Sequence, residues 1–481
     1  MSWPARAACW LALGLVAQAG TVPATGLEQQ IRAILGRYKI READCGVYVA
    51  SVARRKAVAA INADEPLVIA SNKKLLTTAA ALDLLGPGYE LVTRVCIDGP
   101  LENGVLKGNI VIVGGGDPNI SARFYEGEAL AVPKGWARTI HKAGIERIQG
   151  DVVADDRIFD RQLLHPDWPD NQLDRWYCAP VCGLAYNDGC VDVTVSPGPA
   201  AGSPASVSLD PATSYVKLEN GCKTTSARNR HVVSFGRRPG SRTIRAWGEC
   251  WVKAEGLTGS VAIDDPALML ATVLREQLVA AGVQMAGGAV LAARDGKAAR
   301  LTEICRTTSD LATSVVIANK RSQNLYAEQM HKLLGALVER DGSFEGGNRA
   351  LGRFLAGLGI RPGSYTSADG SGMSRNNRFS AQQVGSVLLY MADHPSTAAF
   401  VDSLSIGGVD GTLSRRLEGV RGRIRAKTGH LAGASALSGY VTSEEGEPQL
   451  AFSILMNSPR STNAAQDDIC QLPVRLAEAI E

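Results

Sequence analysis

The chain has 481 residues, of which 45% are hydrophobic and 21% charged, and its formal net charge is +3. This composition is typical of a globular protein with two or three domains, and it excludes global disorder. The basic residues are too dispersed to indicate a nucleic acid as partner. The densest basic cluster runs from Arg228 to Arg245 and has two interpretations, a solvated loop face or a site for an anionic polymer such as the cell wall.

The N-terminus has the pattern of a cleavable secretory signal peptide over residues 1–19. Arg6 supplies the positive charge, residues 7–16 are largely apolar, and Ala17-Gln18-Ala19 forms a small-residue cleavage site before Gly20. The apolar run is too short to span a membrane, and no later stretch approaches about 18 uninterrupted apolar residues. We therefore expect an exported mature chain without a stable membrane anchor.

Nine cysteines follow the predicted cleavage site, and an exported compartment permits disulfides. Their odd number leaves at least one thiol unpaired. We expect one or two disulfides within the crowded group Cys178, Cys182, Cys190, Cys222 and Cys250. The sequence has no Cys-x-x-Cys pair and no His-Glu-x-x-His segment, so it indicates no metal site.

The first predicted elements are a helix over residues 27–38, strands over residues 45–52 and 57–61, and a helix over residues 73–85. Ser71 stands at the N-terminus of the second helix, and Lys74 follows one turn later on the same face. A serine hydroxyl and a lysine amine in this arrangement can meet directly.

Residues 91–269 have a different texture, with short Val- and Ile-rich runs separated by Gly, Pro, Asn and Asp. Strand and turn signals at this density predict a β-rich module. The glycine triplet at residues 114–116 lacks the lysine that completes a phosphate loop, so we expect a tight turn there.

Helical patterns return after this module, with Ser309 and Ser380 as expected N-caps. The predicted helices cover residues 265–283, 309–318, 324–338, 347–358 and 380–392, and the strands that follow them cover residues 422–426, 434–442 and 449–457. A closing helix starts at about residue 462. The sequence therefore predicts an α/β (α+β) fold in which residues 20–90 and 270–481 form one domain, interrupted at residues 91–269 by a β-rich nested insert of one or two small domains.

Three short motifs occur in a fixed order within these elements. Ser71-Asn72-Lys73-Lys74 opens a helix, Ser322-Gln323-Asn324 stands in a break between two helical runs, and Lys427-Thr428-Gly429 lies on an apparent strand followed by His430. Ser214-Tyr215-Val216-Lys217 also fits the first pattern. Because it falls on a predicted strand of the insert, we interpret it as a surface segment.

On these motifs the sequence resembles the serine penicillin-recognising enzymes. It looks most like a class C low-molecular-mass penicillin-binding protein of the D-alanyl-D-alanine carboxypeptidase/endopeptidase family. About 250 residues separate Lys74 from Ser322, where this family has a nested insert. Stretches along nearly the whole mature chain share the resemblance, namely residues 114–118, 155–159, 187–193, 369–375 and 408–413.

The resemblance implies a penicillin-binding/β-lactamase-like α/β/α sandwich, a periplasmic location and no cofactor. It also implies peptidoglycan stem peptides as substrates and β-lactam antibiotics as covalent inhibitors. A free serine hydroxyl is a poor nucleophile, so Ser71 needs a base. Burial and a nearby cation would lower the pKa of Lys74 enough for that role, while Lys427 would remain the cationic partner. Whether the proton reaches Lys74 directly or through Ser322 stays open.

Further roles are carried over by the same resemblance. Ser322 would pass a proton to the departing D-alanine, and Asn324 would hold the substrate amide. Lys427 and Thr428 of the Lys427-Thr428-Gly429 strand would bind the terminal carboxylate. The backbone N–H groups of Ser71 and His430 would form the oxyanion hole.

A second set of residues concerns the stem peptide's side chain. The resemblance points to Asp155, Phe159 and Arg375 as a pocket for a free amino/carboxylate terminus such as that of diaminopimelate. The alternative is that Arg375 caps a loop and Asp155 closes a turn. Ala432 lies where some relatives carry glutamine, which leaves the side-chain preference open.

Two other functions compete with a DD-peptidase. A β-lactamase is the first, but the sequence contains no Glu-x-x-Leu-Asn segment to position a deacylating water. A non-catalytic scaffold that binds the cell wall is the second, but it has no chemical need for Ser71, Lys74, Ser322 and Lys427 together.

Overall fold

The computed structural model of the chain describes residues 26–294, 300–460 and 462–478. The predicted signal peptide at residues 1–19 and the predicted new N-terminus at Gly20 lie outside the described residues. Among the residues described, no helix combines the length and the apolar character that a membrane crossing requires.

The two ends of the chain build one six-stranded antiparallel sheet, whose strand order is β2-β1-β23-β22-β21-β20. Its strands are β1 (Cys45–Ser51), β2 (Lys56–Ile61), β20 (Ser405–Ile406), β21 (Ile424–Leu431), β22 (Ala434–Thr442) and β23 (Pro448–Met456). Every residue of β22 is buried, because helices cover both faces of the sheet. A short pair, β3 (Leu67–Val68) with β19 (Arg378–Phe379), lies outside this sheet.

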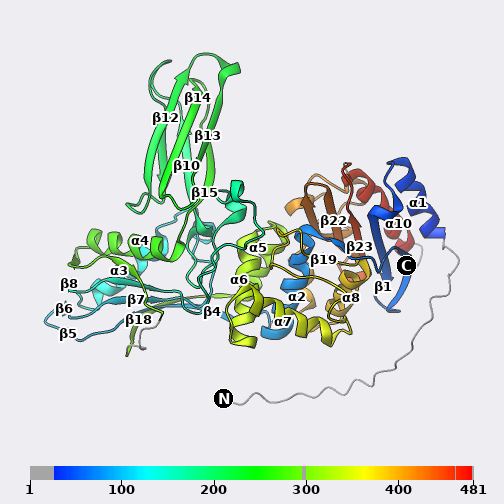
Figure 1. Cartoon of the computed structure of the whole chain (residues 1–481), viewed down its shortest axis with the longest axis horizontal. Coiled ribbons are helices and arrows are strands. Elements are labelled where there is room, and N and C mark those ends of the chain that lie inside the picture. Colours follow the sequence, from blue (N-terminus) through cyan, green and yellow to red (C-terminus); the bar gives the residue numbers. More distant parts are fainter. Residues whose placement is uncertain (1–25, 295–299, 461, 479–481) are drawn as a thin grey trace.

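Two helical layers enclose the sheet, and each has its own apolar core (Figure 1). The outer layer contains α1 (Gly26–Arg37) and α10 (Asn463–Glu478). The inner layer contains α2 (Lys73–Leu85), α5 (Leu311–Lys320), α6 (Asn324–Leu334), α7 (Phe344–Gly357), α8 (Ala381–Ala392) and α9 (Thr397–Asp402). The predicted α/β/α sandwich is therefore confirmed.

The insert forms a second body beside the sandwich, and four small sheets organise it (Figure 1). Its first part has the sheets β17-β9-β7-β4-β18 and β16-β8-β6-β5 with helices α3 (Ala131–Lys142) and α4 (Pro266–Ala280). The strands here are β4 (Glu90–Ile97), β5 (Leu101–Glu102), β6 (Val105–Leu106), β7 (Ile110–Val113), β8 (Arg147–Ile148), β9 (Val152–Asp155), β16 (Gln284–Met285), β17 (Ala289–Leu291) and β18 (Thr302–Asp310).

The second part of the insert projects away from the rest of the molecule (Figure 1). It has the sheets β11-β10-β15 and β12-β14-β13. Their strands are β10 (Cys190–Ser196), β11 (Ser206–Asp210), β12 (Lys217–Thr225), β13 (Val232–Arg237), β14 (Thr243–Trp251) and β15 (Leu257–Ala262). One hydrophobic core runs through both parts of the insert.

The insert ends later than the sequence predicted. We expected the return to the main domain at residue 270, but α4, β16, β17 and β18 all belong to the insert. The strand β18 pairs with β4 from Thr302–Ile97 to Asp310–Glu90, so the insert closes on itself at residue 310. Its boundaries are therefore about residues 90 and 310, since partner strands far apart in the chain decide them.

The predicted N-cap is confirmed for α8 and is wrong for α5. Ser380 caps α8 as predicted, and the structure adds a capping box with Gln383. The cap of α5 is Asp310, whose side chain accepts from Thr313 N at 2.7 Å, and not Ser309. Ser309 is the last but one residue of β18, and its hydroxyl donates to Asp117 Oδ1 at 2.8 Å.

The expected disulfides are not formed in this structure. All nine cysteines within the described ranges are free thiols, and eight of them are buried, namely Cys45, Cys96, Cys178, Cys182, Cys190, Cys222, Cys250 and Cys470. Cys178 lies in the core of the sandwich, whereas Cys222 and Cys250 lie in the core of the insert. Cys222 and Cys250 are on the paired strands β12 and β14 but out of register, since Cys222 faces Gly248 and Cys250 faces Thr224. Burial raises the pKa of Cys178 and Cys182 to about 12, which leaves both thiols inert.

Candidate active site

Ser71 lies in a single 3₁₀ turn, residues Ala70–Asn72, that runs directly into α2. The turn is preceded by the buried strand β3, and Ala70 has a φ of 46°, a conformation uncommon for a residue with a side chain. Lys74 lies one turn further along α2, and its Nζ is 3.1 Å from Ser71 Oγ. The Ser-x-x-Lys spacing therefore places the amine against the hydroxyl.

Lys74 is fully buried and has three oxygen partners. Its Nζ donates to Asn324 Oδ1 at 2.7 Å and to Ser371 O at 2.9 Å, in addition to Ser71. Burial lowers the pKa of Lys74 to about 7, against the opposing effect of the carboxylates of Glu328 and Asp369. An appreciable fraction of this amine is thus neutral near pH 7 and can accept a proton.

A second serine–lysine pair comes from the other two motifs. Lys427 Nζ, on β21, donates to Ser322 Oγ at 2.8 Å and to Thr428 O at 2.8 Å. Ser322 has a φ of 56° in the break between α5 and α6. Burial, and then the charge of Lys74, lower the pKa of Lys427 well below its ordinary value. The cationic role expected of Lys427 stays a prediction.

Contacts with β21 hold the nucleophile turn against the sheet. The Asn72 side chain bridges two strands, since its nitrogen donates to Lys427 O at 2.9 Å and its oxygen accepts from Ser438 Oγ at 2.6 Å. A side chain at Gly429 would come within 2.8 Å of Ile69 O and 3.1 Å of Ser71 N. Glycine is thus required for β21 to approach the backbone of Ser71.

The remaining predicted binding residues surround these pairs. Asn324, the first residue of α6, donates from Nδ2 to Tyr177 O at 2.8 Å while its Oδ1 accepts from Lys74. Thr428 Oγ1 donates to Thr412 Oγ1 at 2.8 Å. His430 is exposed at the end of β21.

Residues 370–374 form a loop that lies against the turn that holds Ser71 and against Lys74. Glu328, buried on α6, accepts from the N–H groups of Gly370 and Ser371, each at 2.7 Å. Asp369 accepts from Gly372 N at 2.7 Å and from Ser374 N at 2.6 Å. Two buried carboxylates therefore hold the loop that presents Ser371 O to Lys74.

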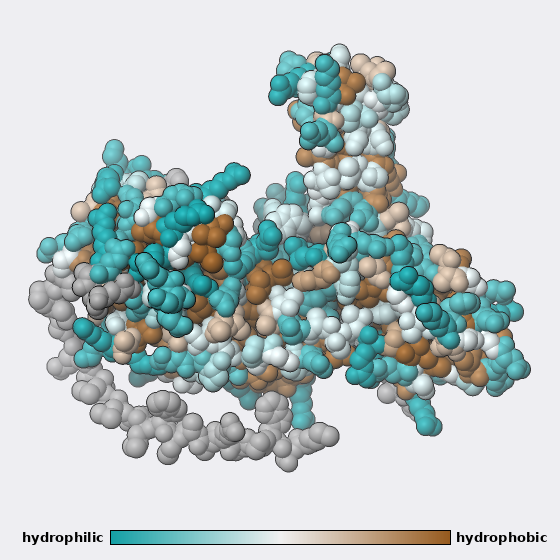
Figure 2. Space-filling view, turned by 180° about the vertical axis from the view of Figure 1, so that it is seen from behind, coloured by the Kyte–Doolittle hydropathy of each residue, from teal (hydrophilic) through white to brown (hydrophobic). Residues whose placement is uncertain are grey.

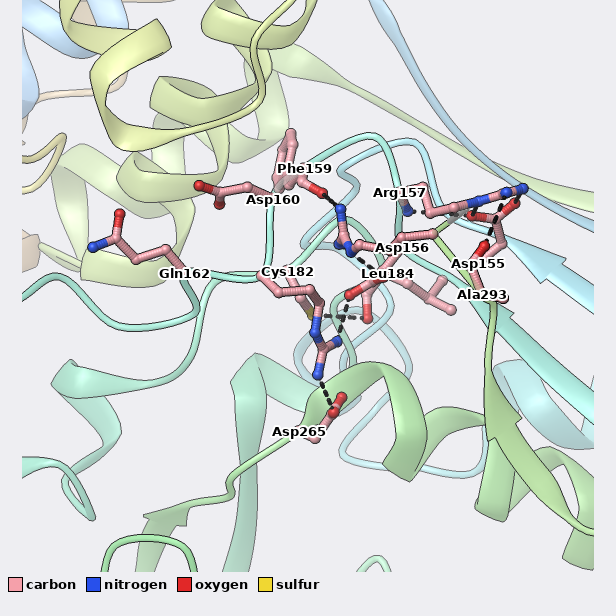
Figure 3. Close-up of polar contacts among 12 residues, drawn as sticks. Asp155, Asp156, Arg157, Phe159, Asp160, Gln162, Cys182, Leu184, Asp265 and Ala293 are labelled. Atoms are coloured by element: carbon pink, nitrogen blue, oxygen red, sulfur yellow. Dashed lines mark hydrogen bonds and ion pairs between the residues drawn. The ribbon is translucent and has the colours of Figure 1, made fainter. Parts of the chain in front are cut away.

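Arg375 lies at this site, whereas Asp155 and Phe159 do not join it. Arg375 Nη1 donates to Ala432 O at 2.6 Å, in the turn that follows the third motif. Asp155 is engaged by Arg157, whose Nη2 donates to its Oδ2 at 2.7 Å, within the sheet of the insert (Figure 3).

Phe159 is buried against Leu91 and Leu333. Leu333 lies at the C-terminal end of α6, whereas Asn324 is the first residue of that helix. The predicted three-residue pocket is therefore not assembled. Residues 155–159 instead belong to the insert, where Arg161 forms ion pairs with Asp156 and Asp265. Figure 3 labels these two carboxylates.

Sequence reasoning missed several residues that shape the site, namely Asn72, Glu328, Asp369, Ser371 and Asp167. Asp167 Oδ2 accepts from Asn376 Nδ2 at 2.9 Å, next to Arg375. No apolar stripe singled out Glu328, because its neighbours one turn away on α6 include His331 and Lys332. Within the described residues, no group of three or more His, Cys, Asp and Glu side chains is placed to hold a metal ion.

The second Ser-x-x-Lys match, Ser214 to Lys217, has none of these features. Ser214 donates through N and Oγ to Glu276 Oε1, at 2.8 and 2.5 Å, and Lys217 is exposed at the start of β12. Ser214 is bound to Glu276 and Lys217 is exposed, so the second Ser-x-x-Lys match is a surface segment.

Comparisons with known proteins agree with this geometry. The family model described as D-Ala-D-Ala carboxypeptidase 3 (S13) matches residues 27–479. The D-alanyl-D-alanine carboxypeptidase of Actinomadura sp. (strain R39) is 32% identical over 481 aligned residues, which cover 96% of this chain and 86% of that protein.

Solved structures show the same fold. Penicillin-binding protein 4 from Haemophilus influenzae has a TM-score of 0.77 at 22% identity, over 94% of this chain and 99% of its own. A complex of that protein with a β-lactam has a TM-score of 0.72 at 21% identity, with the same coverage. The chain therefore belongs to the D-Ala-D-Ala carboxypeptidase 3 (S13) family, whose members are serine, penicillin-binding carboxypeptidases acting on peptidoglycan peptides.

Proposed function

We propose that this chain is a periplasmic serine DD-peptidase that cleaves after the penultimate D-alanine of peptidoglycan stem peptides through an acyl-enzyme on Ser71. The observation that carries the proposal is the 3.1 Å contact between Ser71 Oγ and the buried amine of Lys74. A base of lowered pKa in contact with a hydroxyl is what an activated nucleophile requires. Cross-bridge bonds to diaminopimelate are included, since they too follow a D-alanyl carbonyl.

Acylation uses the two serine–lysine pairs in turn. Ser71 Oγ attacks the carbonyl carbon while the neutral Lys74 takes its proton, and the backbone N–H groups of Ser71 and His430 stabilise the oxyanion. When the tetrahedral intermediate collapses, the C–N bond breaks and Ser322 gives a proton to the departing amine. Lys427 Nζ, 2.8 Å from Ser322 Oγ, can replace that proton. Water then hydrolyses the ester.

The terminal carboxylate of the substrate binds at Lys427 and Thr428 in this proposal. An anion at this position favours the ammonium form of Lys427 and so opposes the burial that lowers the pKa of this amine. The same contact selects peptides with a free C-terminus or its equivalent in a β-lactam. β-Lactams would acylate Ser71 by the same route.

A fluorescent penicillin tests the proposal directly. We expect stable labelling that Ser71→Ala abolishes and that the matched Ser214→Ala change leaves intact. Rapid release of the label would identify a β-lactamase instead, and no labelling would identify a non-catalytic scaffold. Digestion of muropeptides followed by mass measurement then separates release of D-alanine from cleavage of cross-bridges.

Location is tested by the processed end of the chain. In a diderm host we expect the mature protein in the periplasmic fraction with Gly20 at its N-terminus. An unprocessed chain in the cytoplasmic fraction would contradict this part of the proposal.

A further inference from the structure

The sheet β12-β14-β13 concentrates positive charge at one place. It and its connecting loops, residues 217–251, contain eight basic side chains and two acidic ones, although the whole chain has a net charge of only +3. The basic residues are Lys217, Lys223, Arg228, Arg230, Arg237, Arg238, Arg242 and Arg245, and the acidic residues are Glu219 and Glu249. The sheet projects from the molecule, so this charge is presented to large partners (Figure 1).

One face of this sheet adds an exposed indole to the charge. Along β14, the outward residues Arg245 and Trp247 alternate with the buried Ile244 and Ala246. Trp247 is 51% exposed, which is unusual for so large an apolar side chain. Figure 2 shows hydrophobic residues between hydrophilic ones on this projection.

A hollow of about 510 Å³ opens beside Trp247. Glu219, Arg238 and Arg245 line it together with Asp174, which comes from the loop before Trp176. Arg245 Nε is held at 2.9 Å from Glu219 Oε2. Arg238 has no ion pair within the part of the chain that the structure describes, so its charge is available to a ligand.

The loop that contains Asp174 leads from this hollow to the active site. Two residues further on, Trp176 is 41% exposed and lines a second hollow of about 360 Å³, with Arg123, Arg321 and Gln323. The next residue, Tyr177, accepts from Asn324 Nδ2 through its carbonyl. Residues 174–177 thus touch the first hollow, the second hollow and the catalytic motif in that order.

The second hollow repeats the chemistry of the first. It pairs an exposed indole with Arg321, whose guanidinium, like that of Arg238, makes no ion pair among the described residues. Gln323 follows Arg321 by two positions and lies in the second motif, beside Ser322. Each hollow therefore offers an apolar ring and a free cation.

We propose that the two hollows form a docking path for the polymeric part of peptidoglycan. This inference rests on the proposed function, because it concerns the same substrate outside the scissile bond. The free guanidinium groups of Arg238 and Arg321 bind carboxylates of neighbouring stem peptides. The indoles of Trp176 and Trp247 stack on the C–H faces of the sugar rings. A peptidoglycan strand that fills both hollows and the active site makes more contacts than a free peptide, so the enzyme would bind the polymer more tightly.

Binding to protein-free sacculi tests this inference without turnover. In a Ser71→Ala background, we expect sacculi to retain the protein and the double change Trp247→Ala, Arg238→Ala to reduce retention at least fivefold. Val290→Ala, a change of a 38% exposed apolar residue elsewhere in the insert, is the control and should retain full binding. Thermal unfolding checks that both variants keep the fold.

Other outcomes are informative. Equal retention of the double variant and its parent would overturn the inference, as would retention only on sacculi that still carry protein, since the partner would then be a polypeptide. In the active enzyme, the ratio of sacculus digestion to D-alanine release from a soluble peptide should fall by a similar factor. Failure of the proposed function looks different, because the chain with Ser71 intact would then neither bind penicillin covalently nor release D-alanine, whatever the Ser71→Ala chain does on sacculi.

Discussion

Lys74 Nζ lies 2.9 Å from the carbonyl oxygen of Ser371, a residue 297 positions further along the chain. The N–H of the same residue donates to Glu328 at 2.7 Å, so the backbone of Ser371 connects a buried carboxylate to the proposed base. Glu328 also faces the buried charges of Lys73 and Asp369. The loop 370–374 is therefore a positioning element for Lys74, set by charge as well as by packing.

Glu328→Gln should weaken the hold of Glu328 on the loop 370–374. The amide must turn a donor toward one of the N–H groups of Gly370 and Ser371, which leaves a buried donor unpaired and costs about 1–3 kcal/mol of stability. We expect a lower maximal acylation rate and a lower midpoint in urea unfolding. Glu345→Gln, at an exposed position on α7, is the control and should change neither. An unaltered acylation rate in Glu328→Gln would remove the positioning role.

The pKa of Lys74 predicts how acylation depends on pH. Below about pH 7 the amine carries a proton and cannot accept another, so the second-order rate of penicillin acylation should fall about tenfold per pH unit there. Above that value the rate should level off. Stopped-flow labelling between pH 5 and 9 measures this limb, and a rate independent of pH over the range would exclude Lys74 as the base.

The same limb should move in Glu328→Gln, and the direction follows from charge. The Glu328 carboxylate raises the pKa of Lys74, so its removal lowers that pKa and shifts the limb toward lower pH. A loss of structure alone would lower the plateau without this shift. A limb displaced to higher pH would show that the carboxylate does not act on Lys74 through its charge.

The local sequence predicted the motifs and most helices well. The helix over residues 73–85 has the predicted bounds, because its start follows a serine-containing turn and its composition is rich in Leu and Ala. Ser380 was identified as a cap because serine is a preferred N-cap residue and a helical run follows it. These signals act over a few residues, so one sequence is enough to find them.

Features that depend on distant partners were not predicted. The end of the insert is set by pairing between β4 and β18, which lie about 200 residues apart. Asp155 was assigned to a pocket, but Arg157 engages it two residues away. Glu328 gave no local signal of its partners, because these are backbone N–H groups of a loop more than 40 residues later.

Arg375 is expected to read the side chain of the stem peptide. Its position beside Ala432, next to the third motif, favours contact with a carboxylate on the acyl portion of the substrate. Arg375→Gln should lower kcat/KM for peptides with a side-chain carboxylate about tenfold, equivalent to about 1.4 kcal/mol. Peptides with an uncharged side chain should lose much less. Arg378→Gln, an exposed neighbour on β19, is the control, and equal losses for both peptide classes would contradict the assignment.

Gly372 is expected to be essential to the approach of the 370–374 loop to the nucleophile turn. It has a φ of 86°, and a Cβ there would lie 1.8 Å from Ala70 O, which adjoins Ser71. Gly144 provides a matched control, because its φ is 83° but a Cβ would meet nothing within 4 Å.

Gly144→Ala should therefore cost only the left-handed strain of about 1–2 kcal/mol. Gly372→Ala should lose more stability in urea unfolding and also lose penicillin acylation, because the overlap must push Ala70 and Ser71 away from Lys74. Equal destabilisation by the two substitutions, with acylation retained in both, would show that the loop can withdraw without disturbing the serine–lysine contact.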